Sequence, residues 1–162
     1  IVINGVSKAY AMTGWRVGYA VGDPEIIAAM SKLTGQTTSN LTAVSQYATI
    51  EALTGPQDSV EIMRQAFEER LNTIYPLLCE VPGFEVVKPQ GAFYLFPNVK
   101  KAMEMKGFTD VTAFTTAILE EVGLALITGA GFGAPENVRL SYATDIETLK
   151  EAIRRLHQFM EK

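Results

Sequence analysis

The chain has 162 residues, of which 48% are hydrophobic and 20% charged, a balance that predicts a globular protein with a substantial core. Its formal net charge is −4, so the composition offers no basic surface for nucleic acid or for an anionic membrane. No apolar run approaches the roughly 18 residues of a membrane span, and the first residues do not have the pattern of a signal peptide. We therefore expect a cytoplasmic protein that binds neither nucleic acid nor membrane.

Two short strands are predicted at the start of the chain. Residues 1 to 4 (IVIN) and 16 to 22 (RVGYAVG) have the apolar character of strands. No initiator methionine precedes the first of them, and the sequence opens inside the predicted strand. We therefore expect the chain to be a portion of a longer protein.

Three helices are predicted next. Asp23-Pro24 is a typical helix start, and four apolar residues of the segment 24 to 34 fall on one helical face: Ile26, Ile27, Met30 and Leu33. A second helix is predicted over 42 to 53. The longest periodic segment runs from about 58 to 81 and has an apolar residue every three or four positions. This helix is long enough to join two domains.

The pattern changes to short strands after Gly83. Four strands are predicted, at 84 to 87, 92 to 96, 124 to 128 and 138 to 142. A helix over 110 to 122, which Gly123 ends, interrupts them. The last helix begins where Thr144 and Glu147 stand at the spacing of a capping box. We expect it to bury its apolar stripe, which consists of Ile146, Leu149, Ile153, Leu156 and Met160.

Lys8 follows the first strand, where α/β sheets often place ligands. A partly buried lysine beside another cation is a better nucleophile than a solvated one, and it can form a Schiff base with an aldehyde. Arg16 supplies a nearby cation, and its rigid fork of donors suits a phosphate. Gly14 and Gly18 flank Arg16 and would let a ligand approach the backbone. An aldehyde together with a phosphate is what pyridoxal phosphate offers.

These residues stand within a longer motif, NGVSKAYAMTGWRVGYAVG, at residues 4 to 22. The motif resembles the cofactor-lysine segment of class I aminotransferases, the aspartate aminotransferase family of fold type I. The resemblance continues through PQGAFYLFPNV at 89 to 99 and VRLSYATDIETLKEAIRRL at 138 to 156. It covers the whole chain and corresponds to the C-terminal portion of the family.

The resemblance implies a fold, a cofactor and roles for three residues. Lys8 would bind pyridoxal 5'-phosphate covalently and then move the substrate's α-proton, and Arg16 would bind the cofactor phosphate. Arg139, in VRLSY, would bind the α-carboxylate of the substrate. The implied reaction transfers an amino group from an amino acid, aspartate-like or aromatic, to a 2-oxo acid, in a protein that is a homodimer when intact. The chain alone would be inactive, because other parts of the site would lie elsewhere.

The implied fold class is α/β: the end of a fold-type I large domain followed by a small α+β C-terminal domain. Residues 1 to 62 would complete the large, cofactor-binding domain. Residues 63 to 162 would form the interdomain helix and the small domain. Gly5 departs from relatives that have serine or threonine at this place, and it could offer only its backbone to the phosphate.

Two other functions share the same residue types. A fold-type I lyase would also need the lysine, the phosphate arginine and the carboxylate arginine. A non-catalytic relative could use the domain for dimerisation or ligand sensing within a regulator.

The remaining candidate residues have simpler interpretations. The glycines of 128 to 138 lack the following helix of a dinucleotide-binding loop, so we expect a flexible turn that leads to Arg139. His157 and Cys79 are the only histidine and the only cysteine, and we expect no metal site. Tyr94 and Tyr142 are predicted to be core residues with hydrated hydroxyl groups.

Overall fold

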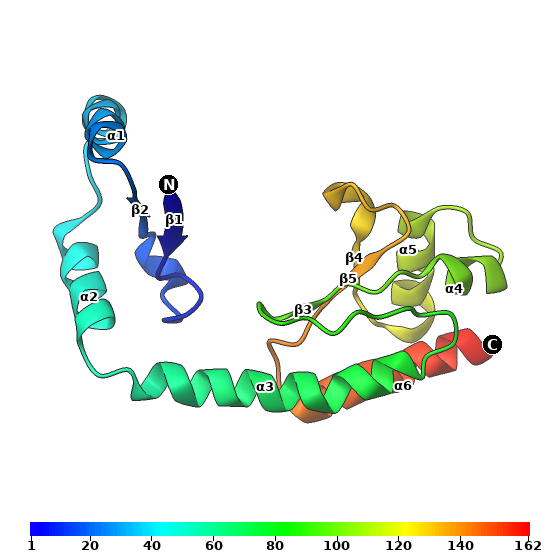
Figure 1. The fold of residues 1–162 in the computed structure, drawn as a ribbon. Coiled ribbons are helices and arrows are strands. Elements are labelled where there is room, and N and C mark those ends of the chain that lie inside the picture. The colour runs from blue at the N-terminus through cyan, green and yellow to red at the C-terminus, as the bar shows by residue number, and fades with distance from the viewer. The chain divides into compact units, whose positions relative to one another are not determined.

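The computed structural model describes all residues from Ile1 to Lys162. The chain divides into two compact units, Ile1–Met63 and Arg64–Lys162. Figure 1 shows the order of the elements along the chain. The long helix α3 (Asp58–Cys79) contains the division between the units. None of the helices combines the length and the apolar character needed to cross a bilayer.

The first unit begins with an antiparallel pair of strands, β1 (Val2–Gly5) and β2 (Gly18–Val21). Their register joins Val2 to Val21 and Gly5 to Gly18. The prediction of two strands is confirmed, but the second is shorter because Arg16 has a left-handed backbone with φ of 57°. Between the strands lies a single 3-10 turn, η1 (Thr13–Trp15). Only two apolar side chains of the unit are buried, Val6 and Val17.

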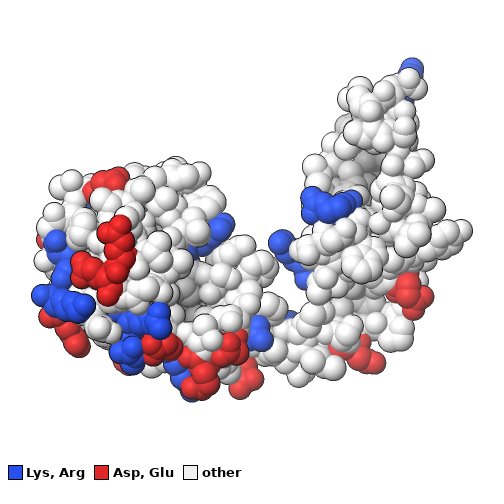
Figure 2. Space-filling view, turned by 180° about the vertical axis from the view of Figure 1, so that it is seen from behind, with Lys and Arg blue, Asp and Glu red and all other residues white.

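Two helices follow, and both begin at a capped residue. The Asp23 carboxylate accepts hydrogen bonds from the backbone N–H groups of Glu25 and Ile26, at the start of α1 (Pro24–Thr37). The Thr42 hydroxyl accepts one from Ser45 at the start of α2 (Ala43–Thr54). No residue of α1 is buried. The surface of this unit carries few charges, and the side visible in Figure 2 is mostly white.

The second unit contains a three-stranded antiparallel sheet with the order β3-β5-β4. The strands are β3 (Tyr94–Leu95), β4 (Ile127–Thr128) and β5 (Val138–Ser141). In the register, Leu95 pairs with Leu140 and Ile127 pairs with Arg139. Leu95, Val138 and Leu140 are buried, so one face of the sheet belongs to the core.

The strand predicted over 84 to 87 is wrong. Only Glu85 pairs, through an isolated bridge with Asn98 in which two backbone hydrogen bonds of 2.9 Å are exchanged. Val87 already points to solvent, because no partner strand continues beside it. Phe84 is buried in the core and Val86 packs against the core, but the segment forms no strand ladder.

Three helices complete the second unit: α4 (Lys100–Met105), α5 (Val111–Val122) and α6 (Ile146–Glu161). The sequence did not predict α4, which is too short to show a period. The α5 helix ends at Gly123 as predicted. These helices and α3 enclose a core of nineteen buried apolar residues, including Ile74, Leu78, Phe114, Ile118 and Phe159.

The predicted capping box of the last helix is wrong by one residue. The N-cap of α6 is Asp145, whose carboxylate accepts hydrogen bonds from the backbone N–H and the hydroxyl of Thr148, at 2.8 and 2.7 Å. Thr144 instead donates its hydroxyl to Asp145. A carboxylate is a stronger acceptor than a hydroxyl, which favours Asp145 at the cap. The hydrogen bonds from Thr148 lower the pKa of Asp145 to about 2.

Candidate functional site

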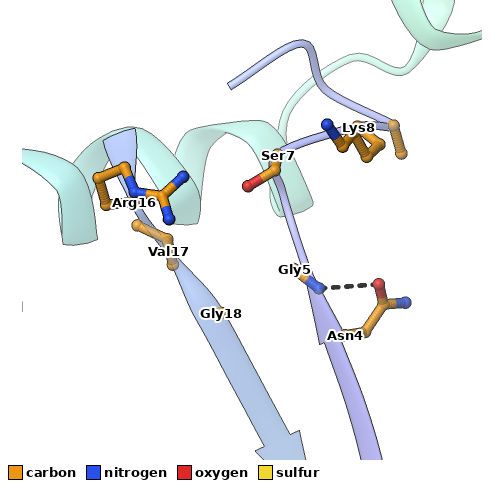
Figure 3. Close-up of a pocket in the computed structure, with 8 residues that line it drawn as sticks. Asn4, Gly5, Ser7, Lys8, Arg16, Val17 and Gly18 are labelled. Atoms are coloured by element: carbon orange, nitrogen blue, oxygen red, sulfur yellow. Dashed lines mark hydrogen bonds between the residues drawn. The ribbon is translucent and has the colours of Figure 1, made fainter. Parts of the chain in front are cut away.

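Lys8 and Arg16 line the same hollow in the first unit (Figure 3). The hollow lies where β1 ends and β2 begins, and its volume is about 530 Å³. Its lining consists of Asn4, Gly5, Ser7, Lys8, Ala9, Arg16, Val17 and Gly18. Two cationic side chains that are eight positions apart in the sequence therefore share one ligand-sized space.

The backbone after β1 places Lys8 at this hollow. Val6 is fully buried and anchors the chain at the end of the strand. The carbonyl of Val6 accepts a hydrogen bond from Tyr10, and the carbonyl of Lys8 accepts one from Ala11, at 3.3 and 3.1 Å. Ala11 has a positive φ of 54°, as the tight turn requires. Lys8 itself is exposed, so its side chain is accessible to a ligand.

Arg16 is held by the turn that precedes β2. Its left-handed backbone is uncommon for a residue with a Cβ, and the cost of such a conformation is about 1 kcal/mol or more. Its guanidinium Nη1 donates to the carbonyl oxygen of Thr13 at 3.1 Å. Trp15 is 48% exposed, so its ring is not packed beneath the loop. The turn therefore presents Arg16 at the rim of the hollow without a packed tryptophan below it.

Gly5 is required by the close approach of the two strands. A Cβ at this position would lie 2.9 Å from the carbonyl oxygen of Val17, too close for any side chain unless the backbone shifts. The N–H of Gly5 donates to Oδ1 of Asn4 at 2.8 Å (Figure 3). Serine or threonine here would therefore require the two strands to move apart, and Asn4 engages the one backbone donor of Gly5.

Arg139 lies on the central strand β5 of the second unit. Its guanidinium carbon is 4.5 Å from the centre of the Tyr94 ring and 4.7 Å from that of Phe132. None of the ion pairs in the structure involves Arg139. The sequence motif indicated Arg139, but neither ring was predicted to be its neighbour. Strand alternation places Tyr94 on the same face as Phe96, but it does not indicate which strand lies beside them.

The glycine-rich segment before β5 is tightly bonded, which corrects the expectation of a flexible turn. It forms a 3-10 turn, η2 (Gly129–Phe132). The N–H of Gly129 donates to the carbonyl of Asn137 at 2.7 Å, and the carbonyl of Gly129 accepts from Ala134 at 3.0 Å. A Cβ on Gly129 would lie 2.3 Å from the Ala134 oxygen, so only glycine fits.

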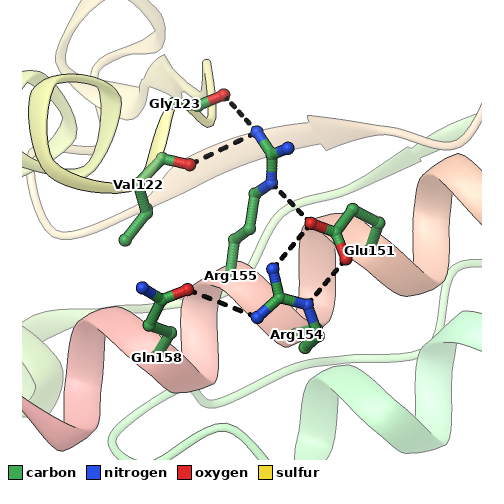
Figure 4. A network of polar contacts seen from close by, with 6 residues as sticks. All are labelled: Val122, Gly123, Glu151, Arg154, Arg155 and Gln158. Atoms are coloured by element: carbon green, nitrogen blue, oxygen red, sulfur yellow. Dashed lines mark hydrogen bonds and ion pairs between the residues drawn. The ribbon is translucent and has the colours of Figure 1, made fainter.

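Arg154 and Arg155 on α6 differ from Arg139 because a carboxylate holds both of them (Figure 4). Arg154 and Arg155 both donate to Glu151, at distances of 2.7 to 2.9 Å. Arg155 also donates to the carbonyl groups of Val122 and Gly123 at the end of α5. The hydrogen bonds from Arg154 and Arg155 lower the pKa of Glu151 to about 2. This cluster links α6 to α5 and leaves few donors for a ligand.

The remaining candidate residues have no neighbours that would form a second site. Tyr142 is a core residue as predicted, and its hydroxyl donates to the carbonyl of Ala92 at 2.9 Å. Burial raises the pKa of this hydroxyl. Tyr94 is only partly buried, and Cys79 is exposed. The structure contains no group of three or more His, Cys, Asp or Glu side chains that could hold a metal ion.

Comparison with known proteins identifies the family. The sequence profile of aminotransferase class I and II matches residues 1–156, so the chain belongs to this family and the resemblance is confirmed. It is 81% identical over 162 residues to an asparagine–oxo-acid transaminase of Streptococcus mutans. It is 58% identical over 161 residues to an aspartate aminotransferase of Geobacillus stearothermophilus. These alignments cover 100% and 99% of the chain but only 41% of each relative, so the chain spans less than half of their length.

The fold is also shared with a solved structure. The aspartate aminotransferase of Thermotoga maritima superimposes with a TM-score of 0.88 at 41% identity, over 99% of this chain and 40% of that one. The predicted fold class, a portion of a fold-type I aminotransferase with mixed helices and strands, is confirmed.

Proposed function

We propose that this chain is the portion of a pyridoxal-phosphate-dependent aminotransferase that supplies its lysine and two of its arginines. The whole protein would transfer an amino group from an amino acid to a 2-oxo acid. The observation that carries the proposal is that Lys8 and Arg16 line one hollow at the end of β1. Membership of the aminotransferase family supports the same reaction.

The side chains around the hollow have the chemistry that pyridoxal phosphate requires. Lys8 offers a primary amine for the aldehyde, and Arg16 offers a planar fork of donors for the phosphate. Ser7 also lines the hollow, and its hydroxyl can donate to a phosphate oxygen. Gly5 adds little, since Asn4 already accepts from its N–H. The remaining phosphate donors would come from other parts of the whole protein.

Each residue then has a defined task. Bound pyridoxal phosphate supplies an electron sink for the carbanion at the substrate's Cα. Lys8 would hold the cofactor through Nζ, and the same amine, once released, would take the α-proton and return it. Arg16 would fix the phosphate end, with Thr13 limiting the rotation of its guanidinium. Arg139 would bind the α-carboxylate through two parallel charge-assisted hydrogen bonds.

We propose asparagine or aspartate as the amino donor, because the relatives described above are named for these two amino acids. Aromatic amino acids are the second candidates. The same names favour amino-group transfer over the lyase and the non-catalytic regulator. The ratio of kcat/KM values for asparagine, aspartate and phenylalanine in the full-length protein tests the donor. A higher value for phenylalanine would contradict it.

The proposal extends to the organisation of the whole protein. Residues 1 to 62 would complete the large domain, and residues 63 to 162 would form the interdomain helix and the small domain. The exposed apolar residues of α2, among them Val44 and Tyr47, support contacts with other parts of a cytoplasmic homodimer. The chain alone would lack turnover, because groups from outside it are needed to complete the site.

Reduction with borohydride tests the assignment of Lys8. The full-length protein would be incubated with pyridoxal phosphate, reduced, digested and mapped for the labelled peptide. We expect the label on Lys8 and loss of turnover in Lys8→Ala. Lys32→Ala is the matched control, because Lys32 is an exposed lysine of the same unit on α1. A label on Lys32, or turnover in Lys8→Ala, would overturn the proposal.

A further inference from the structure

We propose that Tyr94 and Phe132 form an aromatic clamp that positions the guanidinium of Arg139 for a carboxylate ligand. This inference rests on the proposed function, since it takes the substrate carboxylate as the ligand of Arg139. It adds two positioning residues that do not themselves need to touch the substrate.

The strand order brings the two rings to Arg139 from different neighbours. Arg139 lies on the central strand β5, with β3 on one side and β4 on the other. Tyr94 belongs to β3 and pairs with Ser141, which is on the same face of β5 as Arg139. Phe132 ends the η2 turn that follows β4. The clamp is therefore made by three separate segments, of which β3 is distant in the sequence from η2 and β5.

The distances place both rings within range of a cation–π interaction. Separations of 4.5 and 4.7 Å from the guanidinium carbon to the ring centres are well below the usual limit of about 6 Å. Such contacts attract the cation through the face of the ring and use none of its N–H donors. The five donors of Arg139 therefore stay available while the group is held in place.

Arg154 and Arg155 show how the donors of an arginine are lost to a carboxylate of the protein. Glu151 accepts hydrogen bonds from both of these guanidinium groups (Figure 4). A carboxylate from the protein would compete with a substrate carboxylate for the same donors. Arg139 has neutral rings as neighbours instead, so its charge is free to pair with an anion.

Neighbouring residues support both rings, although Phe132 is 52% exposed. Phe132 makes an edge contact with Phe96, with ring centres 6.1 Å apart and planes at 83°. The hydrogen bonds of Gly129 hold the η2 turn from which Phe132 projects. On the other side, Tyr142 donates to the carbonyl of Ala92 and fixes the chain just before Tyr94. Rings on two sides of the guanidinium reduce the rotamer entropy that Arg139 would lose when it binds a ligand.

The experiment measures equilibrium binding of 2-methylaspartate to the full-length protein loaded with cofactor. This probe has an α-carboxylate but no α-hydrogen, so binding is read without turnover. We expect Phe132→Leu and Tyr94→Leu each to raise Kd about tenfold, because each removes one cation–π contact. Phe132→Tyr and Tyr94→Phe keep a ring and should restore binding. Ile127→Ala is the matched control, since Ile127 lies opposite Arg139 on β4 and has no ring.

The outcomes separate the clamp from the proposed function. If Arg139→Gln weakens binding and the two leucine variants do not, the clamp is overturned and the role of Arg139 stands. If Arg139→Gln binds 2-methylaspartate as the wild type does, the proposed role of Arg139 is wrong and the clamp is wrong with it. Equal losses of cofactor affinity and thermal midpoint in the leucine variants would show a purely structural role and would also overturn the clamp.

Discussion

Helices α1 and α6 have similar apolar stripes in the sequence, but only the stripe of α6 is buried. On α6, Leu149, Ile153 and Leu156 are 3%, 4% and 0% exposed. On α1, Ile26, Met30 and Leu33 are 45%, 39% and 66% exposed. The same contrast holds for the units, because nineteen apolar residues form the core of the second unit and only Val6 and Val17 are buried in the first.

The difference shows that an apolar stripe in the sequence predicts which face of a helix can be buried. It does not show which element of the structure will cover that face. In the second unit, the sheet, α3, α4 and α5 pack against α6 or against its neighbours within one core. In the first unit, no described element covers α1. The chain spans 41% of the length of its relatives, and we propose that the rest of a full-length protein covers these faces.

The largest expected effect comes from producing the two units separately. Residues 64 to 162 should fold with a cooperative thermal transition, because each large apolar side chain in the core contributes about 1.5 to 3 kcal/mol by burial. Residues 1 to 63 should show no such transition, since almost none of their apolar side chains is buried. Differential scanning calorimetry of both fragments measures this. A cooperative transition in residues 1 to 63 would remove the contrast.

A pair of aromatic substitutions tests the same contrast within the intact chain. Phe114 is fully buried and contacts the rings of Phe108 and Phe159. Phe114→Ala should lower the free energy of unfolding by about 3 to 5 kcal/mol, because it leaves a cavity. Tyr47 is exposed on α2, and Tyr47→Ala should change the free energy of unfolding by less than about 0.5 kcal/mol. Urea unfolding followed by circular dichroism gives both values, and similar losses would contradict the prediction.

A smaller effect is expected where α6 meets the end of α5. Arg155→Met keeps the length of the side chain but removes its hydrogen bonds to Glu151, Val122 and Gly123. The loss should be about 1 kcal/mol of unfolding free energy, since the side chain is partly exposed and the carbonyl groups can bind water. Arg154→Met is the control, because the hydrogen bonds of Arg154 go to Glu151 and Gln158 and not to α5. Equal losses in the two variants would show that the link to α5 contributes nothing.

The smallest effect concerns pH and the cap of α6. The pKa of Asp145 falls from 3.8 to about 2 on folding, chiefly through the side-chain hydrogen bond from Thr148. A depressed pKa stabilises the folded state above the unfolded value and loses that contribution as the pH falls towards 2. Asp145→Asn keeps an acceptor oxygen at the cap but does not titrate. The advantage of the wild type over Asp145→Asn in urea midpoint should therefore shrink between about pH 5 and pH 2.

Glu151 has a depressed pKa as well, but both proteins contain it, so it cancels from this comparison. A difference between wild type and variant that stays constant with pH would show that the Asp145 charge does not stabilise the fold.

The sequence alone determined the features that depend on neighbouring residues. Asp23-Pro24 was predicted to begin α1, Gly123 to end α5, and the first two strands to stand near residues 1 to 4 and 16 to 22, and the structure agrees. Caps and turns act over about four residues, so a local pattern contains most of their physical cause. The motif around Lys8 and Arg16 also lies within one short segment, which is why it could be recognised.

Only the tertiary structure decided the features that join distant segments. The sequence 84 to 87 has the alternation of a strand, but the absence of a partner beyond Glu85 left it unpaired. Gly5 is explained by the carbonyl of Val17 on the opposite strand. The rings at Arg139 come from residues 94 and 132, and no local pattern links these positions to 139. Strand pairing and packing depend on which surfaces meet, and a pattern along one segment does not contain that information.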